Sequence, residues 1–77
     1  MRNRESTVHY LKLIGANVKK LRLERKLSTT AVARASQIPL DVYRAFEAGK
    51  YDADLMQIFA LSQVLKVHPK EFFLGIE

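Results

Sequence analysis

The sequence has no cysteine, two histidines and three glycines among its 77 residues. Without cysteine, neither disulfides nor a thiolate metal site can stabilise the fold, and two histidines alone do not indicate a zinc site. The three glycines form no phosphate-binding loop, and the serines have no catalytic base near them in the sequence. We therefore expect no metal, no cofactor and no enzymatic activity.

Long apolar segments are also missing. No apolar run approaches the roughly 18 residues that a membrane-spanning helix needs. The stretch from Val8 to Ile14 is interrupted by His9 and Lys12, so it lacks the continuous apolar region of a signal peptide. We expect a cytoplasmic protein that makes no membrane contact. A single domain of this length has a small core, so its stability should rest on dense helix packing and oligomerisation.

Positive charge is concentrated in the first third of the chain. Residues 1–26 hold eight of the 13 lysines and arginines but two of the eight acidic residues, and the net charge of the whole chain is +5. A basic domain of this size suits a polyanionic partner such as nucleic acid. A solvated basic surface without such a partner is the alternative.

Hydrophobic periodicity predicts five helices and no strands, and therefore an all-α fold. The first helix is expected from about Ser6, a possible N-cap, to Arg25. Ser28 is a second N-cap candidate, and Asp52 and Asp54 mark the start of a later helix. The other four helices are predicted over residues 29–35, 40–48, 55–65 and 69–75.

The apolar positions predict which helix faces form the core. They recur every three or four residues along the first helix and again along the helix at 55–65, as expected for one buried stripe on each. The expected core side chains are Val8, Leu11, Ile14, Val18, Leu21, Val32, Ala33, Leu55, Ile58, Leu61, Leu65 and Phe72.

Two of the predicted helices are separated by a very short break. Residues 37–39 join the helix at 29–35 to the helix at 40–48. Pro39 suits the first turn of a helix, where a missing N–H costs nothing, and Gly49 is a common type of C-terminal stop. Two short helices joined by a tight turn are typical of a helix-turn-helix unit, whose second helix usually lies in the DNA major groove.

Apolar and small residues recur at a specific spacing through most of the chain: Ile14-Gly15, Val18, Leu21-Arg22, Leu27-Ser28, Val32-Ala33, Ile38, Tyr43, Phe46-Glu47, Gly49, Leu61, Leu65 and Val67. In these residues, the segment from Ile14 to Phe73 resembles the Cro and phage-repressor type of helix-turn-helix domain, also called the xenobiotic-response-element type. The resemblance implies a compact five-helix domain that binds double-stranded DNA.

The same resemblance implies a bacterial or phage transcriptional regulator, a repressor, that binds a palindromic operator as a homodimer and is associated with the nucleoid. The helix at 40–48 would be its recognition helix. Residues 6–77 would form the DNA-binding domain, and residues 1–5 a flexible arm. Arg2 and Arg4 in this arm either reach along a DNA groove or make no contact. Activity would be regulated by concentration, by a partner protein or by proteolysis.

An ion pair between Arg22 and Glu47 is also implied, because residues at these positions link the first and third helices in the family. Two separate surface charges are the alternative. If the pair is partly buried, removal of one partner should cost about 3–5 kcal/mol, whereas an exposed pair is worth less than about 1 kcal/mol.

Four residues lie on the expected outer face of the helix at 40–48. Among them, Arg44 alone can make the bidentate contact with guanine that is the commonest specific readout. Leu40 and Ala45 can touch thymine methyl groups, and Asp41 can accept from a cytosine amino group although it repels nearby phosphates. With so few hydrogen bonds, DNA shape is expected to add to the recognition.

Phosphate contacts are expected at two further places. Ser28, Thr29 and Thr30 lie where a helix begins and can offer hydroxyls and free N–H groups to a phosphate. For Ser28, capping of the helix is a second role that is compatible with this contact. Lys50 and Tyr51 follow the recognition helix, where they either meet the DNA backbone or remain solvated.

The family pattern is not followed everywhere. Thr29 stands where glutamine is common, and Gln37 stands in the turn where glycine is common. Gln37 must therefore accept whatever backbone conformation the turn needs. These departures leave open the alternative that this chain does not bind DNA tightly. The rival hypothesis is that the fold serves as a protein-interaction module, with the apolar face of the helix at 40–48, including Leu40 and Val42, as its binding surface.

A second apolar set remains after the core has been assigned. It lies off the core stripe of the helix at 55–65 and beside Phe72, and we interpret it as a subunit interface between two copies of the chain. A thicker core within one subunit is the alternative. The expected interface residues are Met56, Phe59, Gln63 and Phe73, with Val64 also off the core stripe.

Overall fold

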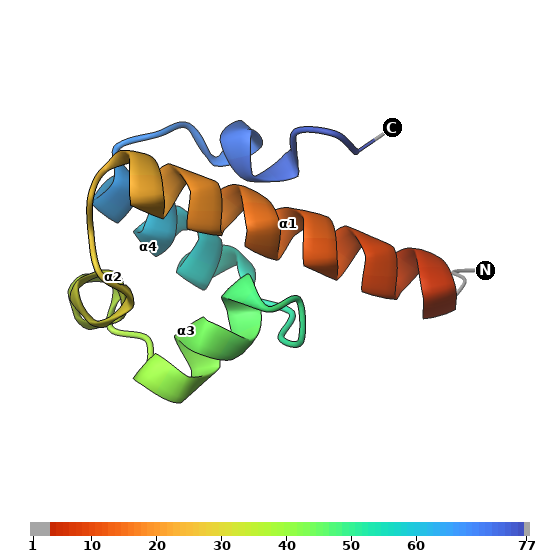
Figure 1. Cartoon of the computed structure of the whole chain (residues 1–77), viewed down its shortest axis with the longest axis horizontal. Coiled ribbons are helices and arrows are strands. Elements are labelled where there is room, and N and C mark those ends of the chain that lie inside the picture. Colours follow the sequence, from red (N-terminus) through yellow and green to blue (C-terminus); the bar gives the residue numbers. More distant parts are fainter. Residues whose placement is uncertain (1–3, 77) are drawn as a thin grey trace.

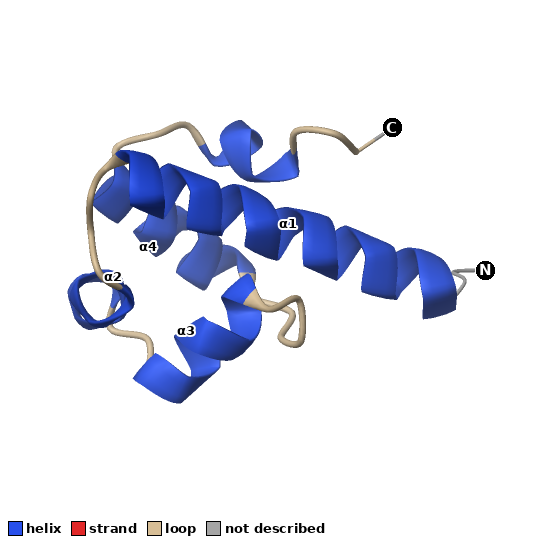
Figure 2. Cartoon of the chain, viewed as in Figure 1, coloured by secondary structure: helices blue, strands red, loops and turns tan. Residues whose placement is uncertain are grey.

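The computed structural model describes residues 4–76 and contains, within them, four α-helices, one 3-10 helix and no strand (Figure 2). The long helix α1 contacts α3 and η1, and α2 contacts α3 and α4. None of the helices in this part of the chain is long and apolar enough to cross a membrane. The elements are α1 (Arg4–Glu24), α2 (Thr29–Ser36), α3 (Leu40–Glu47), α4 (Leu55–Leu65) and η1 (Pro69–Phe73).

Two helix boundaries differ from the prediction by more than one residue. The helix α1 begins at Arg4, so Ser6 lies within it and does not cap it, and residues 4 and 5 of the predicted arm are helical. Arginine and glutamate are good helix formers, which is consistent with this longer helix. Arg2 lies outside the described residues. The fifth helix is a 3-10 helix that ends at Phe73, because Leu74 is extended and Gly75 has a φ of +93°.

The core draws on all five elements. Seven of the predicted core residues are buried, and Leu11, Ile14 and Leu21 are half-buried. The prediction is wrong for Val8 and Leu55, which are 42% and 65% exposed. Val8 lies on a side of α1 that other elements do not cover, since Thr7 and Leu11 near it are half-buried, and Leu55 is the first residue of α4. The buried apolar residues are Val18, Val32, Ala33, Ile38, Tyr43, Phe46, Ile58, Leu61, Leu65 and Phe72.

The turn between α2 and α3 depends on an unusual backbone conformation. Gln37 adopts the left-handed conformation, with φ 60° and ψ 36°, that glycine usually adopts at this point. Its N–H donates to the carbonyl of Arg34, and the N–H of Ile38 donates to that of Ala33. Pro39 is the N-cap of α3 and not part of its first turn. The chain therefore leaves α2 and enters α3 within three residues, as a helix-turn-helix requires.

The helices α1 and α3 approach each other backbone to backbone. A Cβ atom at Gly15 would lie 2.6 Å from the carbonyl oxygen of Glu47, and still closer to that of Phe46. Just after α3, Gly49 has a φ of +77°, and a Cβ atom there would lie 2.7 Å from the Cα of Lys12. Two glycines, one on each side of this contact, thus set the distance between α1 and α3.

Candidate nucleic-acid interface

The helices α2 and α3 cross at a steep angle. Figure 1 shows α2 end-on while α3 runs across the view, and both lie below α1. Tyr43 and Phe46 anchor α3 to the core, where both side chains are buried. The opposite face of α3 is consequently turned outward, as expected for a helix that enters a groove.

The predicted recognition residues have different exposures. Asp41 and Arg44 are exposed and Ala45 is half-buried, so these three lie on the outward side of α3. Leu40 is half-buried and packs against the core, together with Val42. Part of the Leu40 side chain is therefore used for packing within the domain, and the two apolar residues do not form a free surface.

The start of α2 is capped by its predicted residue. The hydroxyl oxygen of Ser28 accepts a hydrogen bond of 3.0 Å from the N–H of Ala31. Thr30 is exposed and Thr29 is half-buried. A capping hydroxyl keeps its own proton free to donate, so Ser28 retains a donor for an anion at this helix end.

The two candidate residues after α3 differ in their exposure. Lys50 is exposed, whereas Tyr51 is half-buried and packs against the core. The Tyr51 hydroxyl donates to Oε1 of Gln57 at 3.0 Å, and the same oxygen accepts from the N–H of Asp54 at 3.0 Å. Asp54 in turn accepts from the N–H of Gln57, which completes a capping box at the start of α4. Tyr51 thus stabilises the connection between α3 and α4.

Arg22 on α1 and Glu47 at the end of α3 form a bidentate ion pair. Nε of Arg22 lies 2.7 Å from Oε2 of Glu47, and Nη2 lies 3.1 Å from Oε1. Each side chain is 9% exposed, so the pair is largely shielded from water. Nη1 of Arg22 donates to the carbonyl of Leu27 at 2.9 Å, which adds the connection between α1 and α2 to the same network.

Tyr43 completes this network from within α3. Its hydroxyl donates to Oε2 of Glu47, one helical turn further on. Burial, together with this hydrogen bond to the carboxylate, raises the pKa of Tyr43 above its usual range, so the hydroxyl stays protonated and donates. The hydrogen bond to Glu47 likewise raises the pKa of Arg22. This role of Tyr43 is not among those predicted from the sequence, although Tyr43 and Glu47 are four residues apart and side chains at this spacing are neighbours on a helix.

A family model described as helix-turn-helix matches residues 18–72, which is most of the chain. The chain belongs to this family, in its Cro and phage-repressor type. The predicted resemblance is therefore confirmed. Members of the family are DNA-binding regulators of transcription and not enzymes, so the outward face of α3 and the start of α2 belong to a DNA-binding domain.

A solved structure supports the fold of this helix-turn-helix domain. The restriction-modification controller protein C.AhdI from Aeromonas hydrophila is similar with a TM-score of 0.79 and 27% sequence identity. The similarity covers 82% of this chain and 96% of that chain. A comparison with curated proteins gave no match.

The predicted interface residues of the helix-turn-helix domain lie on one exposed surface. Met56, Phe59 and Phe73 are 72%, 44% and 41% exposed, and Gln63 is exposed as well. A thicker core within one subunit would require these side chains to be part of the core, and they are not. Val64, in contrast, does pack against the core. A groove of about 270 Å³ beside them is lined mainly by apolar side chains, among them Leu11, Ile14, Leu55, Phe59 and Phe73.

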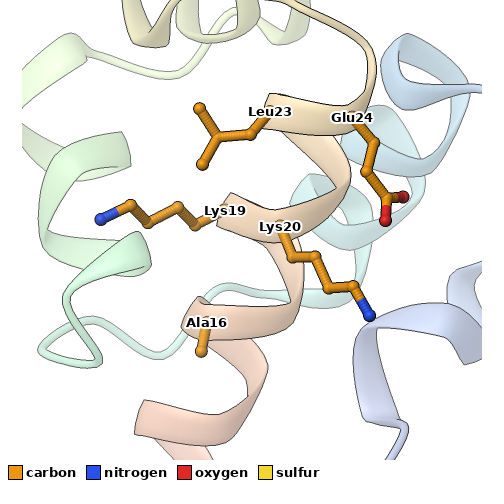
Figure 3. A pocket seen from close by; sticks show the side chains of 5 residues that line it. All are labelled: Ala16, Lys19, Lys20, Leu23 and Glu24. Carbon is orange, nitrogen blue, oxygen red and sulfur yellow. The ribbon is translucent and has the colours of Figure 1, made fainter.

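Another hollow lies on α1 and is drawn in Figure 3. The residues that line it, Ala16, Lys19, Lys20, Leu23 and Glu24, all come from this one helix. One helix cannot surround a small molecule, so the hollow is a shallow part of the surface. One of these residues, Lys19, lies one turn beyond Gly15 and therefore on the side of α1 that meets α3.

Replacement of Glu47 by alanine should destabilise the domain by about 3–5 kcal/mol, because Arg22 would remain as a largely buried, unpaired charge. Urea denaturation would measure this loss of unfolding free energy. Glu24→Ala is the matched control, since Glu24 is exposed on α1, and its effect should stay within about 0.5 kcal/mol. A loss below about 1 kcal/mol for Glu47→Ala would mean that the pair acts like an exposed one.

Proposed function

We propose that the protein is a sequence-specific transcriptional regulator, a repressor, that binds a palindromic operator as a homodimer with α3 in the major groove. The observation that carries this proposal is the position of α3. It is fixed on α1 by the Gly15 contact and by the buried ion pair, while Asp41, Arg44 and Ala45 lie on its outward side. The similarity to a controller protein supports a role in the control of gene expression.

The charges around α3 support DNA as the partner. Lys12 contacts Gly49 just after α3, and Lys19 lies on the α3 side of α1 (Figure 3). Lys12, Lys19, Arg44 and Lys50 are all exposed. Exposed cations on α1, on α3 and just after α3 suit the phosphates that border a DNA groove.

The alternative, a protein-interaction module that uses α3, is less well supported. It requires a free apolar patch that includes Leu40 and Val42, but both are half-buried and pack against the core of the same domain. The residues next to them on the outward side, Asp41 and Arg44, carry charge. Exposed large apolar side chains occur instead on α1 and, as a group that includes the predicted interface residues, on α4 and η1.

Homodimerisation accounts for this exposed apolar surface. Phe59 and Phe73 are large side chains whose exposure on a domain of this size favours association. A two-fold dimer through α4 and η1 would present two copies of α3 about 34 Å apart, which is the spacing of half-sites on one face of the duplex. Two linked half-sites also raise the effective concentration of each α3 at its site.

If several lysines and arginines neutralise phosphates, the logarithm of the affinity for DNA should fall linearly with the logarithm of the salt concentration. The slope should be about −0.9 for each phosphate contact on duplex DNA. Sites for this measurement would come from selection of bound sequences from a random DNA pool. Failure to bind any selected duplex at low salt, or binding that does not depend on salt, would contradict the proposed function.

Arg44→Ala should weaken binding to the preferred site by about 1–3 kcal/mol and relax the preference at one base position, because Arg44 is the residue proposed to contact a guanine. Lys50→Ala is the comparison variant, and it should weaken binding to all sequences to a similar extent. Both changes would be measured on the selected site and on single-base variants of it. An unchanged base preference for Arg44→Ala would assign Arg44 to phosphate binding.

Phe59→Asp should convert the dimer into a monomer that binds the operator much more weakly, since a carboxylate would have to be buried in an apolar interface. Sedimentation at micromolar concentrations would measure the association state. Leu23→Asp is the matched control, because Leu23 is an exposed leucine on α1 outside this surface, and that variant should remain dimeric. A monomeric wild type would contradict the dimer and leave a single α3 as the DNA-binding unit.

A further inference from the structure

The side chain of Asn17 on α1 connects two distant parts of the chain. Its Nδ2 atom donates to the carbonyl oxygen of Phe72 at 2.9 Å and to that of Leu74 at 2.9 Å. An amide nitrogen has two hydrogens, so these two bonds use its full donor capacity. The acceptors lie 55 and 57 residues further along the chain. Asn17 therefore holds the backbone on both sides of Phe73.

The segment that Asn17 holds packs against α1 and α4 but has few backbone hydrogen bonds of its own. The helix η1 has five residues, which is too short for its own hydrogen bonds to fix it. After it, Leu74 is extended and Gly75 turns the chain with a φ of +93° beside Leu13. Phe72 is fully buried and anchors the segment at one point. The two bonds from Asn17 are directional, so they add to this packing a constraint on how the segment is rotated about that anchor.

The rotation of this segment decides where Phe73 points. Phe72 and Phe73 are neighbours with opposite environments, since the first is 0% exposed and the second 41% exposed. Phe73 lines the apolar groove together with Phe59 on α4. Because Asn17 holds the carbonyls of Phe72 and Leu74, it sets the direction of Phe73 relative to Phe59.

We propose that Asn17 is a positioning residue for self-association, which holds Phe73 in the orientation that a second copy of the chain buries. This proposal rests on the proposed dimer. An interface side chain that is already held in its bound orientation loses less conformational entropy when the two copies associate. In the absence of Asn17, the two carbonyls would be solvated, the segment after Phe72 would loosen, and Phe72 would still anchor it to the core.

The test compares the dimer dissociation constants of the wild type and of Asn17→Ala by sedimentation equilibrium. We expect a roughly tenfold weaker dimer, which corresponds to about 1.4 kcal/mol. The affinity of one subunit for a DNA half-site should not change, and the amide hydrogen of Ile76, which is bonded to the carbonyl of Phe73, should exchange faster. Glu24→Ala, an exposed substitution on the same helix, should change none of these quantities.

A double-mutant cycle separates positioning from a general effect on stability. If Asn17 acts through Phe73, Asn17→Ala should have no further effect on dimerisation once Phe73→Ala is present. Asn17→Gln, which keeps both donors on a longer side chain, should recover part of the loss and serves as the readout if Asn17→Ala does not fold.

The outcomes distinguish this proposal from the proposed dimer. A dimeric wild type whose dissociation constant is unchanged in Asn17→Ala would overturn the role of Asn17 and leave the dimer in place. Additive effects of the two alanine substitutions would also overturn it, because Asn17 would then act independently of Phe73. A monomeric wild type would overturn the dimer itself, and the positioning role with it.

Discussion

The contact between α1 and α3 is the constraint on which the rest of the structure depends. Gly15 allows the two backbones to touch, and the ion pair between Arg22 and Glu47 fixes α3 at that position. Tyr43 donates a hydrogen bond to the same carboxylate from within α3. The carbonyl of Leu27, in the connection between α1 and α2, accepts a hydrogen bond from the same arginine. A DNA-binding helix must be held rigidly, since readout of base edges depends on the placement of a few side chains.

The burial of an ion pair in so small a domain has a large cost in desolvation free energy. An apolar pair of similar size can give equal stability, because two charges lose their hydration when they are buried. The pair between Arg22 and Glu47 has a different benefit, which is its directionality. Its two parallel hydrogen bonds can both form in one relative orientation of α1 and α3, whereas contacts between apolar side chains allow several orientations. We infer that the pair specifies the register of α3 more than it adds to the total stability.

Much of the fold could be predicted from the sequence, and the exceptions have physical causes. Periodicity identifies which side of a helix is apolar, but it does not show which of these apolar residues a neighbouring element covers, so it places Val8 and Leu55 in the core although both are exposed. The sequence also predicts a helix over residues 69–75, whereas η1 is a 3-10 helix that ends at Phe73. The partner of Asn17 could not be predicted, because it is a pair of backbone carbonyls that carry no sequence signal.

The helix α1 serves as the common support for both proposed binding surfaces. Gly15 and Arg22 lie on the side that meets α3, whereas Asn17 lies on the opposite side and holds the C-terminal segment. Figure 1 shows this arrangement, with the green α3 on one side of α1 and the blue C-terminal segment on the other. The direction of α3 and the direction of Phe73 are thus both set relative to one straight helix. In a dimer, that common reference would fix the distance between two recognition helices without any direct contact between them.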